Sequence, residues 1–265
     1  MRYAISEQGL SALPAPDSSP VAKLAVALAV FGLIFGGWML ANRYSDTNAP
    51  LPDDRGRDES RCALWFVGSS SIHRWTSLQQ DMAPWDTHNR GIDGATFAQI
   101  LPRFAHVDGD DGTPRAIILY IGENDIAAGV AVRTVIHQLA AFLSLRSDRL
   151  GNVPVLLLSM KPSPTRSANL PDQRLFNAAA RHLVAHMPAA HYADITTPLL
   201  KDGVLGDNYQ PDGVHMNAKG YAIWARVVRH RLTQILPPDL VARCGGKGIS
   251  TQHSMTKKHI LAITP

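Results

Sequence analysis

The chain has 265 residues, of which 45% are hydrophobic and 18% are charged, and its formal net charge is +4. This composition excludes an intrinsically disordered protein and provides for one large globular domain with shorter flanking segments. Basic residues occur without a run of five or more, which favours a mildly positive solvated surface over a nucleic-acid-binding surface.

An uncharged apolar stretch follows a leader that is rich in serine, proline and alanine. The stretch covers 18 residues, from Leu24 to Ala41, and Lys23 and Arg43 lie outside its two ends. At about 1.5 Å per residue, a helix of this length just crosses a bilayer. We therefore predict a single-pass membrane anchor. A buried helix of a soluble domain and a cleaved signal peptide are the alternatives.

The sequence contains two cysteines, Cys62 and Cys244. One lies just before the first predicted strand and the other just after the last predicted helix. In an oxidising compartment they can form a disulfide that closes the domain, and two free thiols are the alternative. The sequence has no Cys-x-x-Cys motif, so we expect no structural zinc site.

The first strand signal ends in a run of serines. Residues 63–67 are Ala-Leu-Trp-Phe-Val, and Gly68, Ser69, Ser70 and Ser71 follow. An unbroken apolar run is typical of a strand buried on both faces, and open α/β sheets bind ligands at the carboxyl ends of their strands. A serine here is a candidate nucleophile if the chain also supplies a base, an orienting acid and donors for an oxyanion.

Two further loops follow predicted strands. Residues 89–96 come after a short second strand that ends near residue 89, and residues 122–125 come after the most apolar run, residues 115–121. Because parallel strands end at the same sheet edge, we expect both loops near the serines. Gly94 is a candidate oxyanion donor through its backbone N–H, and Asn124 is one through its side-chain amide. A role in shaping the turn is the alternative for Asn124.

Apolar periodicity predicts helices between the strands. We expect helices over residues 72–82, 96–104, 131–147, 172–187 and 217–236, and further strands over residues 153–159 and 191–195. His182 and His186 have the i, i+4 spacing of a metal pair, but no glutamate follows His182, which favours two surface histidines.

Three side chains beside these elements have structural interpretations. We interpret Trp75 as a packing residue rather than a substrate platform. Asp125 is interpreted as a cap for the helix that follows it. Lys161, in the loop after the fourth strand, is expected either on the surface or in contact with substrate.

A turn late in the chain supplies the base and the acid. Asp212 and His215 are three residues apart, and Pro211 and Gly213 indicate a turn around them. The carboxylate can then reach Nδ1 of the imidazole and leave Nε2 to face a serine hydroxyl. The sequence therefore contains a candidate nucleophile, base, acid and oxyanion donors.

Taken in order, these four segments resemble the blocks of the SGNH (GDSL-type) hydrolase family, and the resemblance runs from about residue 63 to residue 236. The string Gly-Ser-Ser-Ser-Ile is similar to that of a bacterial subgroup of the family. The resemblance implies a catalytic triad of Ser70, Asp212 and His215, and an oxyanion hole formed by Ser70, Gly94 and Asn124.

The chain departs from the family pattern at two positions. Ser69 stands where the family name has aspartate, and Glu123 stands where glycine or aspartate is more usual. Neither position carries the chemistry, but both border the expected pocket. These departures therefore bear on substrate preference rather than on mechanism.

Five strands that alternate with helices predict a parallel sheet covered by helices on both faces. The resemblance adds the flavodoxin-like strand order 2-1-3-4-5, so the expected fold is a three-layer α/β/α sandwich preceded by a transmembrane helix. We expect a disordered leader, a transmembrane anchor, a linker, a hydrolase domain and a C-terminal tail without structure over residues 1–20, 21–42, 43–61, 62–237 and 238–265, respectively.

The predicted function is hydrolysis of carboxylic esters through an acyl-enzyme on Ser70. One alternative is an envelope carbohydrate O-acetyl esterase or a lysophospholipase, and another is a non-catalytic binding module on the same fold. The mechanism needs neither a metal nor an organic cofactor. The predicted partners are an ester substrate and, through the N-terminal helix, a membrane, with no nucleic acid.

Positive charges flank the predicted anchor on both sides and do not fix its orientation. Arg2 and Lys23 precede it, whereas four arginines follow it within about 20 residues. A single N-terminal anchor ahead of a hydrolase most simply serves a domain outside the cytoplasm. We therefore predict membrane localisation with an extracytoplasmic domain.

Overall fold

The structure is a computed structural model that describes residues 24–26, 28–34, 49–53, 61–108 and 112–246. Contacts divide the chain into one unit over residues 1–47 and a second over residues 48–265. The first unit contributes helical residues at 24–26 and 28–34. The second unit contains every strand of the described ranges.

The structure does not support the predicted membrane anchor over residues 21–42. Within the ranges described, none of the helices has both the length and the apolar character that a membrane span requires. The other residues of the predicted anchor lie outside the described ranges, as does the predicted leader over residues 1–20.

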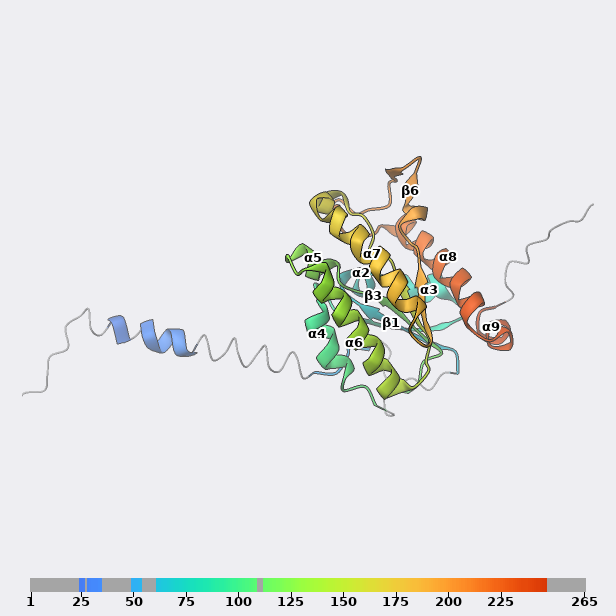
Figure 1. Cartoon of the computed structure of the whole chain (residues 1–265), viewed down its shortest axis with the longest axis horizontal. Helices are drawn as coiled ribbons and strands as arrows, with labels where there is room; N and C mark the ends of the chain where they lie inside the picture. The colour runs from blue at the N-terminus through green and yellow to red at the C-terminus, as the bar shows by residue number, and fades with distance from the viewer. Residues whose placement is uncertain (1–23, 27, 35–48, 54–60, 109–111, 247–265) are drawn as a thin grey trace, which may run out of the picture. The chain divides into compact units, whose positions relative to one another are not determined.

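The second unit is built on a five-stranded parallel sheet with the order β2-β1-β3-β4-β5, and Figure 1 shows β1 and β3 of this sheet behind helices. The strands are β1 (Ala63–Gly68), β2 (Asp86–Gly91), β3 (Ala116–Tyr120), β4 (Val155–Leu158) and β5 (Ala190–Ala193). Every residue of β1 and β3 is buried, which explains their unbroken apolar sequences. The predicted sheet and strand order are confirmed, with shifts of a few residues at the strand ends.

Helices cover both faces of the sheet and form two separate cores. One face packs against α4 (Phe97–Phe104), α6 (Val132–Leu150) and α7 (Leu170–Ala185). The other face packs against α2 (Ser70–His73), α3 (Leu78–Met82), α8 (Ala218–Ile235) and α9 (Pro238–Cys244). Successive β1 side chains alternate between the cores, with Trp65 in the first and Phe66 in the second. The three-layer prediction is therefore confirmed.

The helix predicted over residues 72–82 is two short helices, α2 and α3. The chain bends between them at Trp75, whose indole is 1% exposed and stacks on the Tyr221 ring with 5.0 Å between centroids. The Trp75 indole N–H donates to Asp81 at 2.6 Å, which holds the bend. The packing interpretation of Trp75 is confirmed, and this packing separates the two helices.

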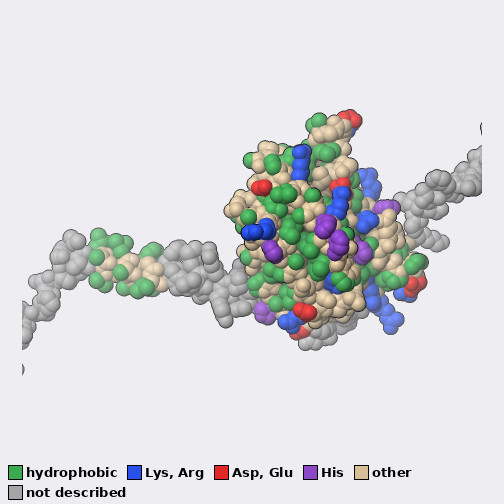
Figure 2. Space-filling model, viewed as in Figure 1, with side chains coloured by type: hydrophobic (Ala, Val, Ile, Leu, Met, Phe, Trp, Pro, Cys, Tyr) green, Lys and Arg blue, Asp and Glu red, His purple; other side chains and the backbone are tan. Residues whose placement is uncertain are grey.

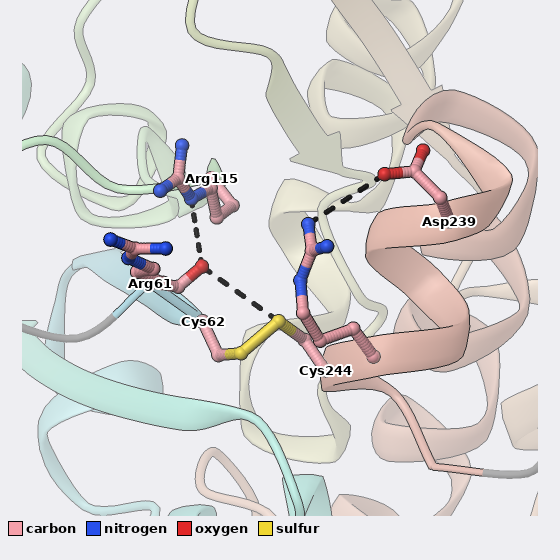
Figure 3. The surroundings of a disulfide bond; sticks show 6 residues. Arg61, Cys62, Arg115, Asp239 and Cys244 are labelled. Atoms are coloured by element: carbon pink, nitrogen blue, oxygen red, sulfur yellow. Dashed lines mark hydrogen bonds and ion pairs between the residues drawn. A yellow bond between two sulfur atoms is a disulfide. The ribbon is translucent and has the colours of Figure 1, made fainter.

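The expectation of an unstructured tail after residue 237 does not hold for residues 238–244, which form α9. Leu240 and Cys244 of this helix are buried. Cys244 forms a disulfide with Cys62, just before β1, with the two Cα atoms 5.3 Å apart (Figure 3). The two cysteines are 182 residues apart in the sequence. A disulfide that closes so long a loop restricts the unfolded chain, which is one source of disulfide stabilisation.

Residues 49–53 lie inside the predicted linker but pack on the domain. Leu51 is 4% exposed and belongs to the core on the α4 side of the sheet. Asp53 accepts a charged hydrogen bond at 2.6 Å from Arg90, whose guanidinium stacks on the Trp65 ring. Apolar and ionic contacts therefore fasten this segment beside β2, whereas residues 54–60 lie outside the described ranges.

The remaining elements are short: α5 (Glu123–Ala127), η2 (Pro164–Asn169), η3 (Thr197–Leu199), β6 (Leu200–Lys201) and β7 (Val204–Leu205). β6 and β7 form an antiparallel hairpin that the sequence pattern does not indicate.

On the face shown in Figure 2, lysine and arginine side chains are spread out, with hydrophobic and neutral atoms between them.

Candidate active site

The serine turn at the end of β1 is fixed by close packing against β3. A Cβ atom on Gly68 would stand 2.1 Å from the carbonyl oxygen of Tyr120, so only glycine fits there. The next residue, Ser69, donates its backbone N–H to the same oxygen at 3.1 Å. Ser70 then begins α2, where a backbone N–H of the first turn has no acceptor within the helix.

Ser70, His215 and Asp212 form a continuous chain of side-chain hydrogen bonds. His215 Nε2 is 2.9 Å from Ser70 Oγ, and His215 Nδ1 is 2.6 Å from Asp212 Oδ2. An ionised carboxylate only accepts hydrogen bonds, so Nδ1 carries the proton and donates to Asp212. Nε2 is therefore the acceptor for the Ser70 hydroxyl.

Asp212 is held in its ionised form by several donors. Burial favours the neutral carboxyl, but hydrogen bonds from the His215 side chain and from the backbone N–H groups of His215 and Val214 outweigh it and lower the pKa of Asp212. The two backbone bonds measure 2.9 and 2.8 Å. The carboxylate is thus fixed in place as well as charged.

The turn that carries Asp212 and His215 packs on η2. Gly213 has φ +65°, and a Cβ there would stand 2.8 Å from a methyl carbon of Thr165. The Thr165 hydroxyl donates to the backbone oxygen of Asp212 at 3.2 Å. Asn217 then caps α8 by accepting the Gly220 N–H at 3.1 Å. Both ends of the turn are therefore anchored.

An ion pair that the sequence pattern does not indicate lies beside the imidazole. Arg74 contacts both carboxylate oxygens of Asp93, at 2.9 and 2.8 Å. Arg74 Nη1 also lies 3.3 Å from His215 Nδ1. Because that nitrogen donates to Asp212, the contact is a close approach of a cation rather than a hydrogen bond. Asp93 offsets part of the positive charge that Arg74 brings near the imidazole.

The loops that carry Gly94 and Asn124 are joined by two hydrogen bonds. The Asn124 amide Nδ2 donates to the Ala95 carbonyl at 3.0 Å, and Asp125 accepts the Phe97 backbone N–H at 3.2 Å. Asp125 therefore caps α4, which precedes it, and the interpretation of Asp125 as a cap for the following helix is wrong. Its carboxylate links the two loops because α4 begins beside the carboxyl end of β3.

Gly94 has φ +71°, a conformation that L side chains rarely adopt, and no atom lies within 4 Å of where its Cβ would stand. Glycine is thus required at this position by backbone conformation and not by space. The structure places Gly94 one residue before Ala95, whose carbonyl accepts the hydrogen bond from Asn124. The two candidate donors therefore lie in loops that contact each other.

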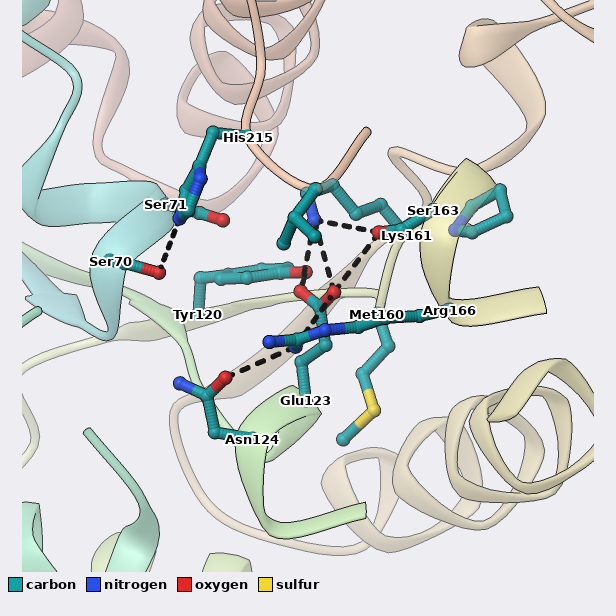
Figure 4. Close-up of polar contacts among 12 residues, drawn as sticks. Ser70, Ser71, Tyr120, Glu123, Asn124, Met160, Lys161, Ser163, Arg166 and His215 are labelled. Atoms are coloured by element: carbon teal, nitrogen blue, oxygen red, sulfur yellow. Dashed lines mark hydrogen bonds and ion pairs between the residues drawn. The ribbon is translucent and has the colours of Figure 1, made fainter. Parts of the chain in front are cut away.

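A buried ionic cluster lies next to Asn124, and the expectation that Lys161 is either on the surface or in contact with substrate does not hold. Lys161 is fully buried, and its Nζ contacts the two Glu123 oxygens at 3.0 and 3.2 Å and Ser163 Oγ at 3.1 Å. Glu123, which is 2% exposed, also accepts hydrogen bonds from Ser163 and the Tyr120 hydroxyl (Figure 4). A buried lysine requires this kind of partner, because an unpaired charge in the interior is very costly.

The cluster keeps Glu123 ionised. Burial raises the pKa of a carboxyl group, but attraction to Lys161, the hydrogen bond from Tyr120 and attraction to Arg166 outweigh burial and lower the pKa of Glu123. Arg166 Nη1 lies 3.3 Å from Glu123 Oε1 and 3.1 Å from Asn124 Oδ1. The cluster is thus in direct contact with the amide of Asn124 (Figure 4).

The other predicted polar pair lies elsewhere. His182 and His186 are exposed on α7 and just after it, with ring centroids 4.6 Å apart, so the surface interpretation is confirmed. In the part of the chain that the structure describes, no group of three or more His, Cys, Asp or Glu side chains is arranged to hold a metal.

The fold and the site together define the class of protein. A serine hydroxyl, an imidazole and a carboxylate are hydrogen-bonded in series at the carboxyl edge of a parallel sheet, as in hydrolases that act on esters. The model of the GDSL-like lipase/acylhydrolase family matches residues 56–223, and the chain belongs to this family. It is therefore a hydrolase acting on ester bonds.

Several solved structures share the fold. A GDSL-like lipase from Bacteroides thetaiotaomicron is 21% identical with a TM-score of 0.55, over 74% of this chain and 98% of that one. A member of the lipolytic G-D-S-L family from Veillonella parvula is 19% identical with a TM-score of 0.55, over 65% and 98%. A carbohydrate esterase family 3 protein from Talaromyces cellulolyticus is 19% identical with a TM-score of 0.51, over 65% and 96%. A search of curated proteins finds no match to this sequence.

Proposed function

We propose that this protein is a serine esterase that hydrolyses carboxylic esters through an acyl-enzyme on Ser70. The observation that carries the proposal is the pair of hydrogen bonds from Ser70 Oγ to His215 Nε2, at 2.9 Å, and from His215 Nδ1 to Asp212, at 2.6 Å. A serine hydroxyl is a weak nucleophile until a positioned base removes its proton. This arrangement provides that base in the required tautomer.

In the first half of the reaction, Ser70 Oγ attacks the carbonyl carbon of the ester while its proton passes to His215 Nε2. The tetrahedral intermediate collapses when the bond from carbon to the alcohol oxygen breaks, and His215 returns the proton to the leaving alcohol. In the second half, His215 takes a proton from water, which attacks the acyl group. The protonated His215 then returns this proton to Ser70, whose bond to carbon breaks. Asp212 remains ionised throughout and stabilises the imidazolium.

The negative oxygen of the tetrahedral intermediate needs donors that are already in place. We assign this role to the backbone N–H groups of Ser70 and Gly94 and to the side-chain amide of Asn124. The hydrogen bond from Asn124 to Ala95 supports the assignment, because it holds the amide against the Gly94 loop. Each such donor is worth about 2.7–4 kcal/mol of activation free energy in enzymes where a donor has been removed.

The proposal is tested by replacing the nucleophile. Ser70→Ala should abolish hydrolysis of p-nitrophenyl acetate, because no other hydroxyl stands at His215 Nε2 among the described contacts. Circular dichroism and the melting temperature check that the variant is folded, and Ser71→Ala is the matched control at the neighbouring serine. Hydrolysis at the wild-type rate by folded Ser70→Ala would remove Ser70 from the mechanism.

A carbohydrate O-acetyl esterase is the second candidate, favoured by the structural similarity to the Talaromyces cellulolyticus protein, which is named a carbohydrate esterase. The ratio of kcat/KM on acetylated xylan to kcat/KM on p-nitrophenyl acetate separates it from a small-ester enzyme. Activity that rises with acyl length from two to twelve carbons would favour a lipid substrate over both.

We also propose that the domain works in an oxidising compartment. Disulfides persist in such compartments and are rare in the cytosol, and both cysteines of this chain are joined in one disulfide. Acid quenching of intact cells, followed by maleimide alkylation of the denatured protein and mass spectrometry, tests this. An unmodified Cys62–Cys244 pair is the expected result, and two alkylated thiols would contradict the proposal.

A further inference from the structure

Arg166 in η2 lies against the side-chain amide of Asn124. Its Nη1 is 3.1 Å from Asn124 Oδ1. A guanidinium has only N–H donors, so the atom that it contacts on the amide must be the oxygen. On the other side, Asn124 Nδ2 donates to the Ala95 carbonyl at 3.0 Å, and a carbonyl can only accept. Both neighbours therefore impose the same orientation on the amide.

This orientation matters for the proposed oxyanion hole. The Asn124 amide has two N–H groups, of which Ala95 takes one and the other is left for the oxyanion. If the amide were turned by 180°, its oxygen would face the Ala95 carbonyl, and its NH₂ group would face the Arg166 cation. We infer that Arg166 is a positioning residue that holds Asn124 with its free donor toward the oxyanion. The inference rests on the proposed esterase function.

Arg166 is itself fixed by the buried cluster. Its Nη1 also contacts Glu123 Oε1 at 3.3 Å, and Glu123 is held by Lys161 at 3.0 Å. Figure 4 shows Arg166 extending from η2, past Glu123, to the amide of Asn124. Because Glu123 and Lys161 are almost wholly buried, few alternative arrangements are open to them. Arg166 is thus anchored on a rigid support.

The charges of the cluster add a second effect. The charges of Lys161 and Glu123 cancel. Arg166 therefore gives the cluster of these three residues one net positive charge, beside the amide oxygen. A cation at Oδ1 draws electron density from the amide and makes its N–H groups stronger donors. Arg166 therefore acts on the reaction through Asn124.

Glu123 precedes Asn124, at a position where the family more usually has glycine or aspartate. The contacts of Glu123 explain this departure. A carboxylate at position 123 binds Lys161 and Arg166, and both cations come from the segment after β4. Glycine could not bind either cation, and an aspartate side chain is shorter by one methylene group. The three residues form one unit that connects the ends of β3 and β4.

A double-mutant cycle tests the inference, with kcat and KM measured on p-nitrophenyl acetate using the full chain. Arg166→Ala should lower kcat about 10- to 100-fold and change KM by less than about threefold, since Asn124 acts in the transition state. In the Asn124→Ala background, Arg166→Ala should lower kcat by less than about twofold, because its effect passes through the missing amide.

Two further variants sharpen the test. Arg166→Lys keeps a cationic donor and should retain more activity than Arg166→Ala, with the difference lost in the Asn124→Ala background. It also preserves the test if Arg166→Ala fails to fold. Arg174→Ala, at an exposed arginine of α7, is the matched control and should leave kcat within about twofold.

Two results would overturn the inference: equal losses from Arg166→Ala with and without Asn124, or a loss confined to KM, which would indicate a substrate contact. Ser70→Ala distinguishes these failures from failure of the proposed function. Hydrolysis that persists in Ser70→Ala removes the esterase mechanism itself. Hydrolysis that depends on Ser70, together with independent effects of Arg166 and Asn124, removes only the positioning role.

Discussion

The two sides of the candidate site are built differently. The side with the proposed base and acid lies on an exposed turn, where the Asp212 side chain is 43% exposed and the His215 side chain 14%. The side with Asn124 is backed by an ion pair in which the Lys161 side chain is fully buried and the Glu123 side chain 3% exposed. One side is set by bonds within a short turn, and the other by charges from distant segments.

This difference indicates which substitutions should impair each side of the candidate site. As the proposed base, His215 needs one tautomer, and the single carboxylate of Asp212, three residues away, is enough to impose it. The proposed role of Asn124 needs one amide orientation, and we infer that this orientation depends on Arg166, which contacts Glu123. Substitutions in the turn should therefore act directly on proton transfer, whereas substitutions in the buried cluster should act through Asn124 and through stability.

The largest expected effect is on the side of the base. Asp212→Asn should lower kcat on p-nitrophenyl acetate by about 10⁴-fold, because an asparagine no longer enforces the proton on His215 Nδ1. The melting temperature should change little, since the turn keeps its backbone bonds. A loss of less than about tenfold would show that Asp212 does not set the tautomer.

The next effect is on the opposite side. Asn124→Ala should lower kcat by about 10²- to 10³-fold with little change in KM, because the donor acts on the transition state more than on bound substrate. The control is Asn177→Ala, which removes a partly buried amide bonded to the Met160 backbone and should affect stability rather than kcat. Equal kcat losses in the two variants would indicate a general structural effect.

The third largest effect is expected from removing the disulfide, which contacts neither side of the candidate site. Cys62→Ser with Cys244→Ser should lower the free energy of unfolding by about 2–5 kcal/mol, as removal of native disulfides does in small secreted domains. At temperatures where the variant remains folded, kcat should be unchanged, because the bond joins the start of β1 to the end of α9. A change in kcat in the folded variant would show that the disulfide also shapes the site.

The smallest effect is a change in the slope with which stability depends on pH, apart from the loss of stability at every pH that follows when Lys161 loses its carboxylate. The pKa of Glu123 is lower in the folded protein than in the unfolded chain, so its contribution to stability is complete above about pH 4.3 and is lost as the pH falls toward the folded value. Chemical denaturation between pH 3 and pH 5 should give a shallower dependence for Glu123→Gln than for the wild type, by up to about 1.4 kcal/mol per pH unit. Identical slopes would contradict an ionised Glu123.

Much of the fold can be predicted from the sequence because its central strands are buried on both faces. The runs at residues 63–67 and 116–121 carry no charged residue, and the structure places them at the centre of the sheet. The break between α2 and α3 could not be predicted, because Trp75 has helical spacing and leaves the helix only to stack on Tyr221, which lies far along the chain. The packing of Leu51 and Asp53 on the domain could not be predicted for a similar reason, since their partners belong to β1 and β2.

The candidate site, like the fold, contains residues that the sequence predicts and residues that it does not. Ser70, Asp212 and His215 stand in short motifs whose spacing indicates their chemistry, and the structure brings them within hydrogen-bond distance. Lys161 and Arg166 have no such motif. The available signal was Glu123, because a carboxylate directly after a buried strand needs cations, and a lysine and an arginine follow the neighbouring strand. Assigning them required the strand order.

Covalent labelling with a fluorophosphonate tests the central claim most directly, because the reagent phosphonylates a serine only when an adjacent base activates it. Intact-mass and peptide mass spectrometry should show one adduct per chain, on Ser70, and no adduct in folded His215→Ala. Ester hydrolysis by the wild type without any adduct, or with an adduct on a different serine, would contradict the account.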